Sequence, residues 1–110
     1  RQDVGDTRYS PTEIFAKEAV SRGAIIDYQD PLVSYWNEMN TDVRQDIPEF
    51  IGYDAVIFTV QHNQYSNIDF TKQKISDNTL IFDDNKVLNK RQIRAIKNKP
   101  NVVFASIGRG

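Results

Sequence analysis

The fold class is indicated most directly by one apolar run, AVIFTV at residues 55–60. Five of these six side chains are apolar, so the expected strand has no polar face that would contact water. Strands of parallel sheets are covered on both faces, and their sequences are therefore almost continuously apolar. The run predicts a buried strand of a parallel α/β sheet.

Shorter apolar runs around this strand predict further strands at residues 24–28, 80–82 and 102–105. Helical patterns lie between these runs, so strands and helices alternate along the chain. This order predicts an α/β fold, a Rossmann-like three-layer domain with a mostly parallel sheet and right-handed crossovers.

Two helix starts carry strong signals. Ser10-Pro11-Thr12-Glu13 has a capping residue, a proline suited to the first helical position and the glutamate of a capping box. Asn89 with Gln92 has the same cap spacing. Gly23 is expected to end the first helix, because glycine adopts the left-handed conformation without strain.

Other segments have weaker signals. A polar loop is expected at residues 61–67, a helix at residues 68–75 and a brief helical turn at residues 46–51. Residues 32–46 fit two descriptions, a short helix or a packed loop, with core or interface roles for Tyr35, Trp36 and Met39. 

The start of the chain departs from the usual order of such a domain. A buried strand normally leads into the first helix, whereas here a polar loop begins at residue 1. We therefore expect that the first strand is missing and that this chain is a fragment of a longer one. The strands beside it would then expose unpaired backbone groups.

The composition fits one domain spanning residues 1–110 and excludes several classes of function. The net charge of −1 lacks the basic excess typical of proteins that bind nucleic acid or membranes. The chain has no cysteine, which excludes disulfides, thiolate metal sites and a cysteine nucleophile, and which fits the cytoplasm. No apolar run is long enough to span a bilayer.

Arg8 is the best candidate for ligand binding. It lies two residues before the cap Ser10, in a loop expected at the carboxyl edge of the sheet, where open α/β sheets bind ligands. Its guanidinium suits phosphate, and the helix N-terminus adds partial positive charge. Judged by residue type alone, an ion pair of Arg8 with Asp3 or Asp6 that braces the loop would be a better interpretation than ligand contact.

The remaining polar candidates have structural interpretations. Asp6 is expected to hold its loop through backbone hydrogen bonds. Asp83 and Asp84 end a strand and could bind a cation, although a solvated turn explains them better. His62, the single histidine, builds no metal cluster, so we expect His62 and Tyr65 to pack in a loop, with contact to another domain left open. No catalytic or metal-binding residue is predicted.

The motifs of this chain resemble the C-terminal domain of the UDP-glucose/GDP-mannose dehydrogenase family. The family's loop, helix and strand motifs match Arg1, Asp3, Asp6, Arg8, Ser10-Pro11, Gly23-Ala24, Tyr28 and Asp30-Pro31. Looser matches follow at residues 53–56, Thr59, His62, residues 80–88 and residues 107–110. One departure is clear, because Asn85-Lys86 stands where the family has Arg-Asn.

The resemblance implies a substrate-binding role without catalysis. The family oxidises the C6 alcohol of a nucleotide sugar to a carboxylate with two NAD⁺. NAD is bound by an N-terminal domain, and the catalytic cysteine also lies outside the matching region. The resemblance thus implies that Arg8 and Arg1 contact a UDP- or GDP-sugar, with Arg1 near the diphosphate or ribose. It also implies that the partners are the other domains of a homo-oligomeric enzyme.

Other functions are less well supported by the residues. A receiver-like signalling domain needs an aspartate after the run at residues 55–60 and a lysine after residues 105–106, and neither is present. A self-contained dinucleotide-binding domain needs Gly-x-Gly-x-x-Gly, which the chain lacks. A noncatalytic interaction module stays open, and so do the sugar and the base of the nucleotide.

Overall fold

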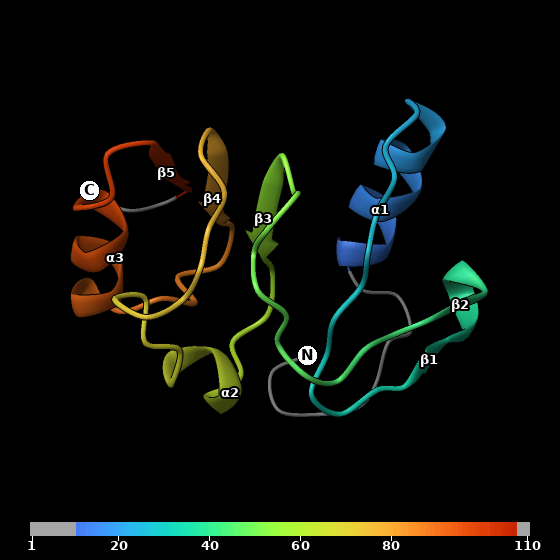
Figure 1. Cartoon of the computed structure of the whole chain (residues 1–110). Coiled ribbons are helices and arrows are strands. Elements are labelled where there is room, and N and C mark those ends of the chain that lie inside the picture. The colour runs from blue at the N-terminus through green and yellow to red at the C-terminus, as the bar shows by residue number, and fades with distance from the viewer. Residues whose placement is uncertain (1–10, 108–110) are drawn as a thin grey trace. The chain divides into compact units, whose positions relative to one another are not determined.

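The computed structural model describes residues 11–107, which divide into two compact units, residues 11–47 and 48–107. The first contains α1 (Pro11–Ser21), β1 (Tyr35–Trp36), the 3₁₀ helix η1 (Asn37–Met39) and β2 (Thr41–Asp42) (Figure 1). The second contains β3 (Ala55–Phe58), α2 (Asn63–Ser66), β4 (Thr79–Asp83), α3 (Lys90–Lys97) and β5 (Val102–Ser106). No helix in residues 11–107 has both the length and the apolar character needed to cross a membrane.

The end of α1 confirms the role expected for Gly23. The N–H of Ala24 donates to the Ala19 carbonyl at 3.1 Å, and the N–H of Gly23 donates to the Val20 carbonyl at 2.9 Å. Gly23 has a φ of +95°, so this hydrogen-bonded cap depends on a left-handed residue. The cap Ser10, which would start the helix, lies outside the described residues.

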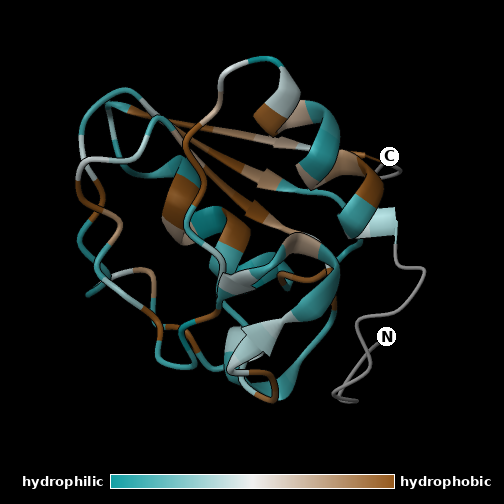
Figure 2. Cartoon of the chain, turned by 90° about the vertical axis from the view of Figure 1, so that its right-hand side faces the viewer, coloured by the Kyte–Doolittle hydropathy of each residue, from teal (hydrophilic) through white to brown (hydrophobic). Residues whose placement is uncertain are grey.

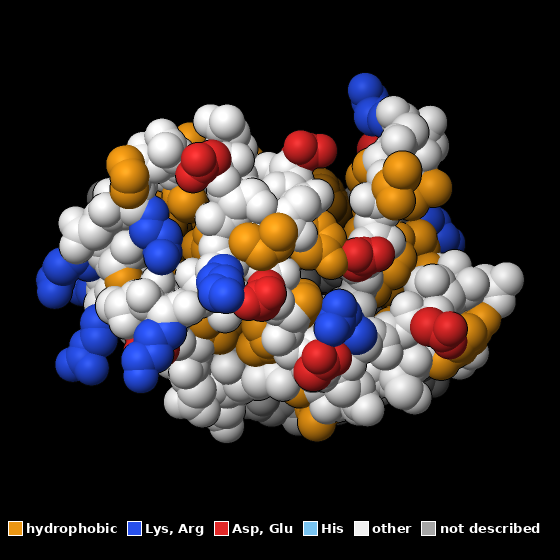
Figure 3. Space-filling model, viewed as in Figure 1, with side chains coloured by type: hydrophobic (Ala, Val, Ile, Leu, Met, Phe, Trp, Pro, Cys, Tyr) orange, Lys and Arg blue, Asp and Glu red, His pale blue; other side chains and the backbone are white. Residues whose placement is uncertain are grey.

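The core of the first unit is small and centres on Trp36. Ala16 of α1 is buried with Val33, Trp36 and Val43, and Tyr28 meets Trp36 edge to face at 5.3 Å between ring centroids. β1 and β2 form a short antiparallel pair, with η1 between them. The structure thus gives Trp36 the core role expected for it. Hydrophobic side chains also stand on the surface of α1 (Figure 3), where Ile14, Phe15 and Val20 are exposed.

The prediction of a strand at residues 24–28 is wrong. These residues have no regular structure, and Ile25 is fully exposed. The backbone makes a single bridge just beyond them, between Gln29 and Arg44. A strand needs a partner along its length, and among the described residues the pairing is limited to the Arg44 N–H, which donates to the Tyr28 carbonyl at 3.0 Å, so the apolar sequence alone does not produce a strand.

The second unit confirms the predicted α/β class. β3, β4 and β5 form a parallel sheet in that order, with Val56 beside Ile81 and Ile81 beside Phe104 (Figure 1). The strands are predominantly hydrophobic (Figure 2), as the continuous apolar runs predict. The first run forms a strand only as far as Phe58, two residues short of its expected end.

One face of this sheet carries the core of the second unit. Phe58, Ile81 and Asp83 are buried on it, and α3 packs against β5. Phe58 lies within 6.3 Å of both Phe50 and Phe70, measured between ring centroids, and these aromatic side chains fill much of the interior. On the opposite face, Ile57 is 38% exposed and Val103 is 59% exposed.

The capping box of α3 is present as predicted. The Asn89 side chain accepts the Gln92 N–H at 2.9 Å, and the Gln92 side chain accepts the Asn89 N–H at 3.0 Å.

The prediction of a helix at residues 68–75 is wrong, because turns replace it. There the Asp69 side chain accepts the N–H and the hydroxyl of Thr71, which favours a turn over a helix.

Two neighbouring predictions are also wrong. The loop expected at residues 61–67 contains the one-turn helix α2. The helical turn expected at residues 46–51 is absent, because Phe50 pairs with the segment around Ile75. Its N–H donates to the Lys74 carbonyl at 2.9 Å, and its carbonyl accepts the Ser76 N–H at 3.0 Å. This long-range pairing overrides the local preference.

Candidate functional site

The candidate site is the carboxyl edge of the parallel sheet in the second unit. β3, β4 and β5 end at Phe58, Asp83 and Ser106, and the loops that follow β3 and β4 lead into α2 and α3. Open parallel sheets bind ligands at this edge, because the loops between strands and helices meet there.

Asp83 shapes the loop after the central strand. Its carboxylate is fully buried and accepts three backbone N–H groups, from Asn85 at 3.1 Å, Val87 at 2.8 Å and Leu88 at 2.9 Å. These bonds fold the backbone around the carboxylate and satisfy groups that would otherwise be orphaned. The structure therefore gives Asp83 a scaffolding position, while Asp84 is exposed beside it.

Polar side chains join this loop to the loop after β3. Gln61 donates to the carbonyl of Asn85 at 3.0 Å, and Asn85 donates to the carbonyl of Thr59 at 3.3 Å. Lys86 follows with a φ of +50°, a left-handed conformation uncommon outside glycine and asparagine, and its side chain is exposed. The edge thus carries an exposed cation in a loop held by Asp83 and Gln61.

His62 packs at this edge, as the sequence predicts. Its side chain is 4% exposed and meets the Tyr65 ring at 5.4 Å between centroids. Tyr65 in turn meets Phe58 at 5.6 Å, and the buried Gln92 side chain donates to the Tyr65 carbonyl at 2.8 Å. His62 therefore belongs to the packing that fixes α2 beside α3.

A surface hollow of about 770 Å³ lies between residues 66–71 and the start of α3. Lys90 and Arg91 line it, but so does Asp69, whose pKa is lowered by its hydrogen bond from the Thr71 hydroxyl and then by that from the Thr71 N–H. The N-terminus of α3 is already capped by Asn89. With both signs of charge and a capped helix, this hollow does not select an anion.

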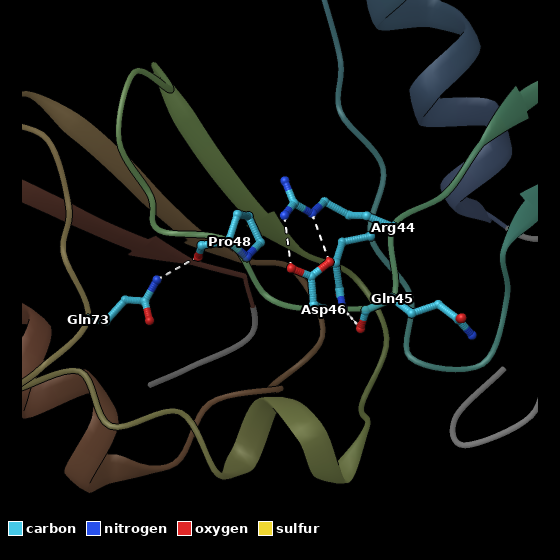
Figure 4. Close-up of polar contacts among 6 residues, drawn as sticks. Arg44, Gln45, Asp46, Pro48 and Gln73 are labelled. Atoms are coloured by element: carbon cyan, nitrogen blue, oxygen red, sulfur yellow. Dashed lines mark hydrogen bonds and ion pairs between the residues drawn. The ribbon is translucent and has the colours of Figure 1, made fainter.

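Arg44 of the first unit already has a carboxylate partner. Its guanidinium donates to both oxygens of Asp46, at 2.9 and 3.3 Å (Figure 4), and this hydrogen bonding holds the pKa of Asp46 below its ordinary value. In the same picture, Gln73 donates to the Pro48 carbonyl at 2.8 Å within the second unit. These contacts brace the backbone and leave Arg44 poorly suited to grip a phosphate.

The predicted substrate contacts lie outside the described residues. Arg1 and Arg8 belong to residues 1–10, as do the motif residues Asp3 and Asp6, and the closing motif extends into residues 108–110. The sequence singled out Asp83 and His62, and it marked Asn85-Lys86 as a departure from the family pattern, whereas it missed the bracing role of Gln61. The sequence signals for Lys86 are its place after a strand and the turn-forming residues 83–85, and its position where the family has Arg-Asn. Within residues 11–107, no three His, Asp or Glu side chains are placed to hold a metal ion.

Comparison with known proteins agrees with the motifs and the fold. Residues 1–90 match the family model described as UDP-glucose/GDP-mannose dehydrogenase family, UDP binding domain. Searches of curated proteins and of solved structures gave no match. The matched region covers 90 of 110 residues and confirms the resemblance drawn from the loop, helix and strand motifs. The chain therefore belongs to the UDP-glucose/GDP-mannose dehydrogenase family, as its UDP-binding domain.

Proposed function

We propose that this domain binds the nucleotide half of a UDP- or GDP-sugar for an NAD-dependent 6-dehydrogenase. That enzyme would oxidise the sugar to the corresponding uronic acid. The observation that carries the proposal is the family match, because residues 1–90 include both the arginine loop and the loop around Asp83.

The proposed contacts are Arg8 and Arg1. Both precede α1, whose N-terminus carries partial positive charge and favours anions. The planar guanidinium of Arg8 can donate two parallel hydrogen bonds to a diphosphate oxygen pair.

The redox chemistry would be supplied by the rest of the enzyme. This chain does not fit NAD, because neither turn between a strand and a helix in its described sheet contains the glycines that let a dinucleotide phosphate approach the backbone. The proposal therefore places NAD and the catalytic cysteine on other domains, in a cytoplasmic homo-oligomer. The isolated chain should form no NADH from NAD⁺ and any nucleotide sugar.

Calorimetric titration of the chain with UDP tests the binding role. Arg8→Ala should weaken UDP binding about tenfold or more, because a hydrogen bond to a charged group contributes about 1.5–3 kcal/mol. Arg22→Ala is the matched control, since Arg22 is exposed and paired with Glu18 at 2.8 Å. In the complete enzyme, Arg8→Ala should raise KM for the nucleotide sugar with little change in NAD⁺ affinity. Unchanged UDP binding would remove Arg8 from the site, and failure of the parent chain to bind either UDP or GDP would refute the proposed role.

A further inference from the structure

The surface hollow of the second unit carries opposite charges on its two walls, and we call it the α3 hollow. One wall is formed by residues 66–71 and includes Asp69, and the other is the start of α3 and includes Lys90 and Arg91. All three of these residues are exposed. The volume of about 770 Å³ lies in the range of about 300–1,000 Å³ that is usual for small-molecule sites.

The opposite charges in the α3 hollow do not pair with each other. The carboxylate oxygens of Asp69 are more than 4.0 Å from the side-chain nitrogens of Lys90 and Arg91. Both hydrogen bonds from Thr71 to Asp69, at 3.0 and 2.6 Å, reach Oδ1, so Oδ2 can accept from a ligand. Both walls therefore present charge that a bound molecule could contact.

Backbone and side-chain hydrogen bonds hold the two walls in place. The buried Gln92 side chain of α3 donates across to the Ile68 carbonyl of the other wall at 3.0 Å. The Asp69 carbonyl accepts the N–H groups of Lys72 at 3.1 Å and Gln73 at 3.0 Å, which fixes the turn that carries the carboxylate. Because the walls are already ordered, a ligand would bind without the cost of arranging them.

Apolar side chains also line the α3 hollow. Ile68 and Ala95 are half-buried, and Phe70 is 1% exposed. Ligand sites typically combine such apolar lining with a few polar groups that fix orientation. A simple anion would use the charge of one wall only, and a simple cation would use that of the other. A molecule that uses the whole lining needs both charges and an apolar part.

We propose that the α3 hollow binds a free ω-amino acid, a zwitterion whose carboxylate and ammonium groups are separated by an apolar chain. The carboxylate would contact Lys90 and Arg91, and the ammonium group would contact Asp69. The apolar chain would pack against Ile68 and Ala95. UDP and GDP have no ammonium group, so this site goes beyond the proposed nucleotide binding and does not depend on it.

Amide NMR titration of the chain with ε-aminocaproate tests the site. Chemical-shift changes should be concentrated at residues 68–71 and 90–92. Caproate lacks the ammonium group and protonated hexylamine lacks the carboxylate, and each should bind about threefold to fivefold more weakly, because exposed ion pairs contribute modestly. Equal binding of the three probes would overturn the proposal, and so would the absence of shift changes in these two segments.

Variants of the two walls should lose the preference for the zwitterion in different ways. In Asp69→Asn, ε-aminocaproate should bind no better than caproate. In Lys90→Gln with Arg91→Gln, it should bind no better than protonated hexylamine. The matched control is Arg94→Gln with Lys97→Gln, which removes two cations from α3 outside the hollow and should preserve the preference. The amide spectrum of each variant shows that it is folded.

A preference that survives in both wall variants would overturn the proposal. Competition with UDP separates this site from the proposed nucleotide site. An excess of UDP should leave the shift changes caused by ε-aminocaproate unaltered, and Asp69→Asn should bind UDP as the parent chain does. Displacement of ε-aminocaproate by UDP would merge the two sites and would also overturn the proposal.

Discussion

At the scale of single residues, Asp83 organises the candidate site. It is the last residue of the central strand, and its buried carboxylate accepts three N–H groups from the loop that follows. The sequence predicts an aspartate at the end of a strand, but it does not predict which atoms the carboxylate meets. Those partners depend on the left-handed turn at Lys86, which sequence preferences for lysine do not favour.

Asp83→Asn should lower the free energy of unfolding by about 1–3 kcal/mol. The asparagine amide nitrogen cannot accept a hydrogen bond, so the N–H of Leu88 or those of Asn85 and Val87 would lose an acceptor inside the fold. Urea unfolding measures the change. Asp84→Asn is the control, because Asp84 is exposed, and should stay within about 0.5 kcal/mol of the parent. Equal effects of the two substitutions would contradict the scaffolding role of Asp83.

Asp69 should titrate below the ordinary aspartate pKa of about 3.9. Its pKa is lowered mainly by the Thr71 hydroxyl and further by the Thr71 N–H. Because the folded pKa is the lower one, this contribution to stability is present above the unfolded pKa and disappears as the pH falls through the folded pKa. Carboxyl NMR titration should show that Thr71→Val raises the pKa of Asp69, whereas Thr71→Ser leaves it low. No difference between these two variants would exclude the hydroxyl as the cause.

At the scale of elements, the sequence correctly predicts helix caps and strands whose signals lie in neighbouring residues. It fails for segments whose structure depends on pairing with a distant part of the chain. The capping box of Asn89 and Gln92 and the glycine cap at Gly23 depend on neighbouring residues, and both are present. The apolar runs of β3, β4 and β5 are also recognisable because they are nearly continuous, but burial on both faces, which such runs predict, is not seen in the described residues, where Ile57 and Val103 are exposed. By contrast, the strand predicted at residues 24–28 lacks a neighbour among the described residues, and the turn predicted at residues 46–51 is replaced by a long-range pairing.

Asn89→Ala should destabilise the second unit by about 1 kcal/mol, because the N–H of Gln92 loses its side-chain acceptor at the start of α3. Asn89→Asp keeps the acceptor and should retain the stability. Asn98→Ala is a control at the other end of the helix, where the backbone N–H makes the cap contact, and should change stability by less than about 0.5 kcal/mol. Urea unfolding followed by circular dichroism measures all three. A loss in Asn98→Ala equal to that in Asn89→Ala would argue against a specific cap.

At the scale of the whole molecule, the protection of backbone amides from hydrogen exchange should be concentrated in one strand, β4. β4 is paired on both sides, with β3 and with β5, and its side chains include the fully buried Ile81 and Thr79. The described part of β3 has one paired neighbour, and residues 24–28 have no regular structure. The sequence predicts the sheet but not this difference in protection, since apolar runs of similar character form β4 and leave residues 24–28 irregular, with Ile25 fully exposed.

Native-state hydrogen exchange should therefore be slowest in β4, faster in β3 and fastest in the irregular segment after α1. Amides of β4 should open only near the global free energy of unfolding of their unit, whereas those of residues 25–28 should exchange with an opening free energy of about 0 kcal/mol. β3 should fall between them, because one of its edges has no paired strand among residues 11–107. Exchange followed by NMR resolves the individual amides, and the Leu80 N–H, which donates to the Asp54 carbonyl at 3.0 Å, is a suitable reference. Strong protection at residues 25–28 would mean that this segment pairs as a strand in solution, as its apolar sequence predicts, and would contradict the irregular backbone described for it.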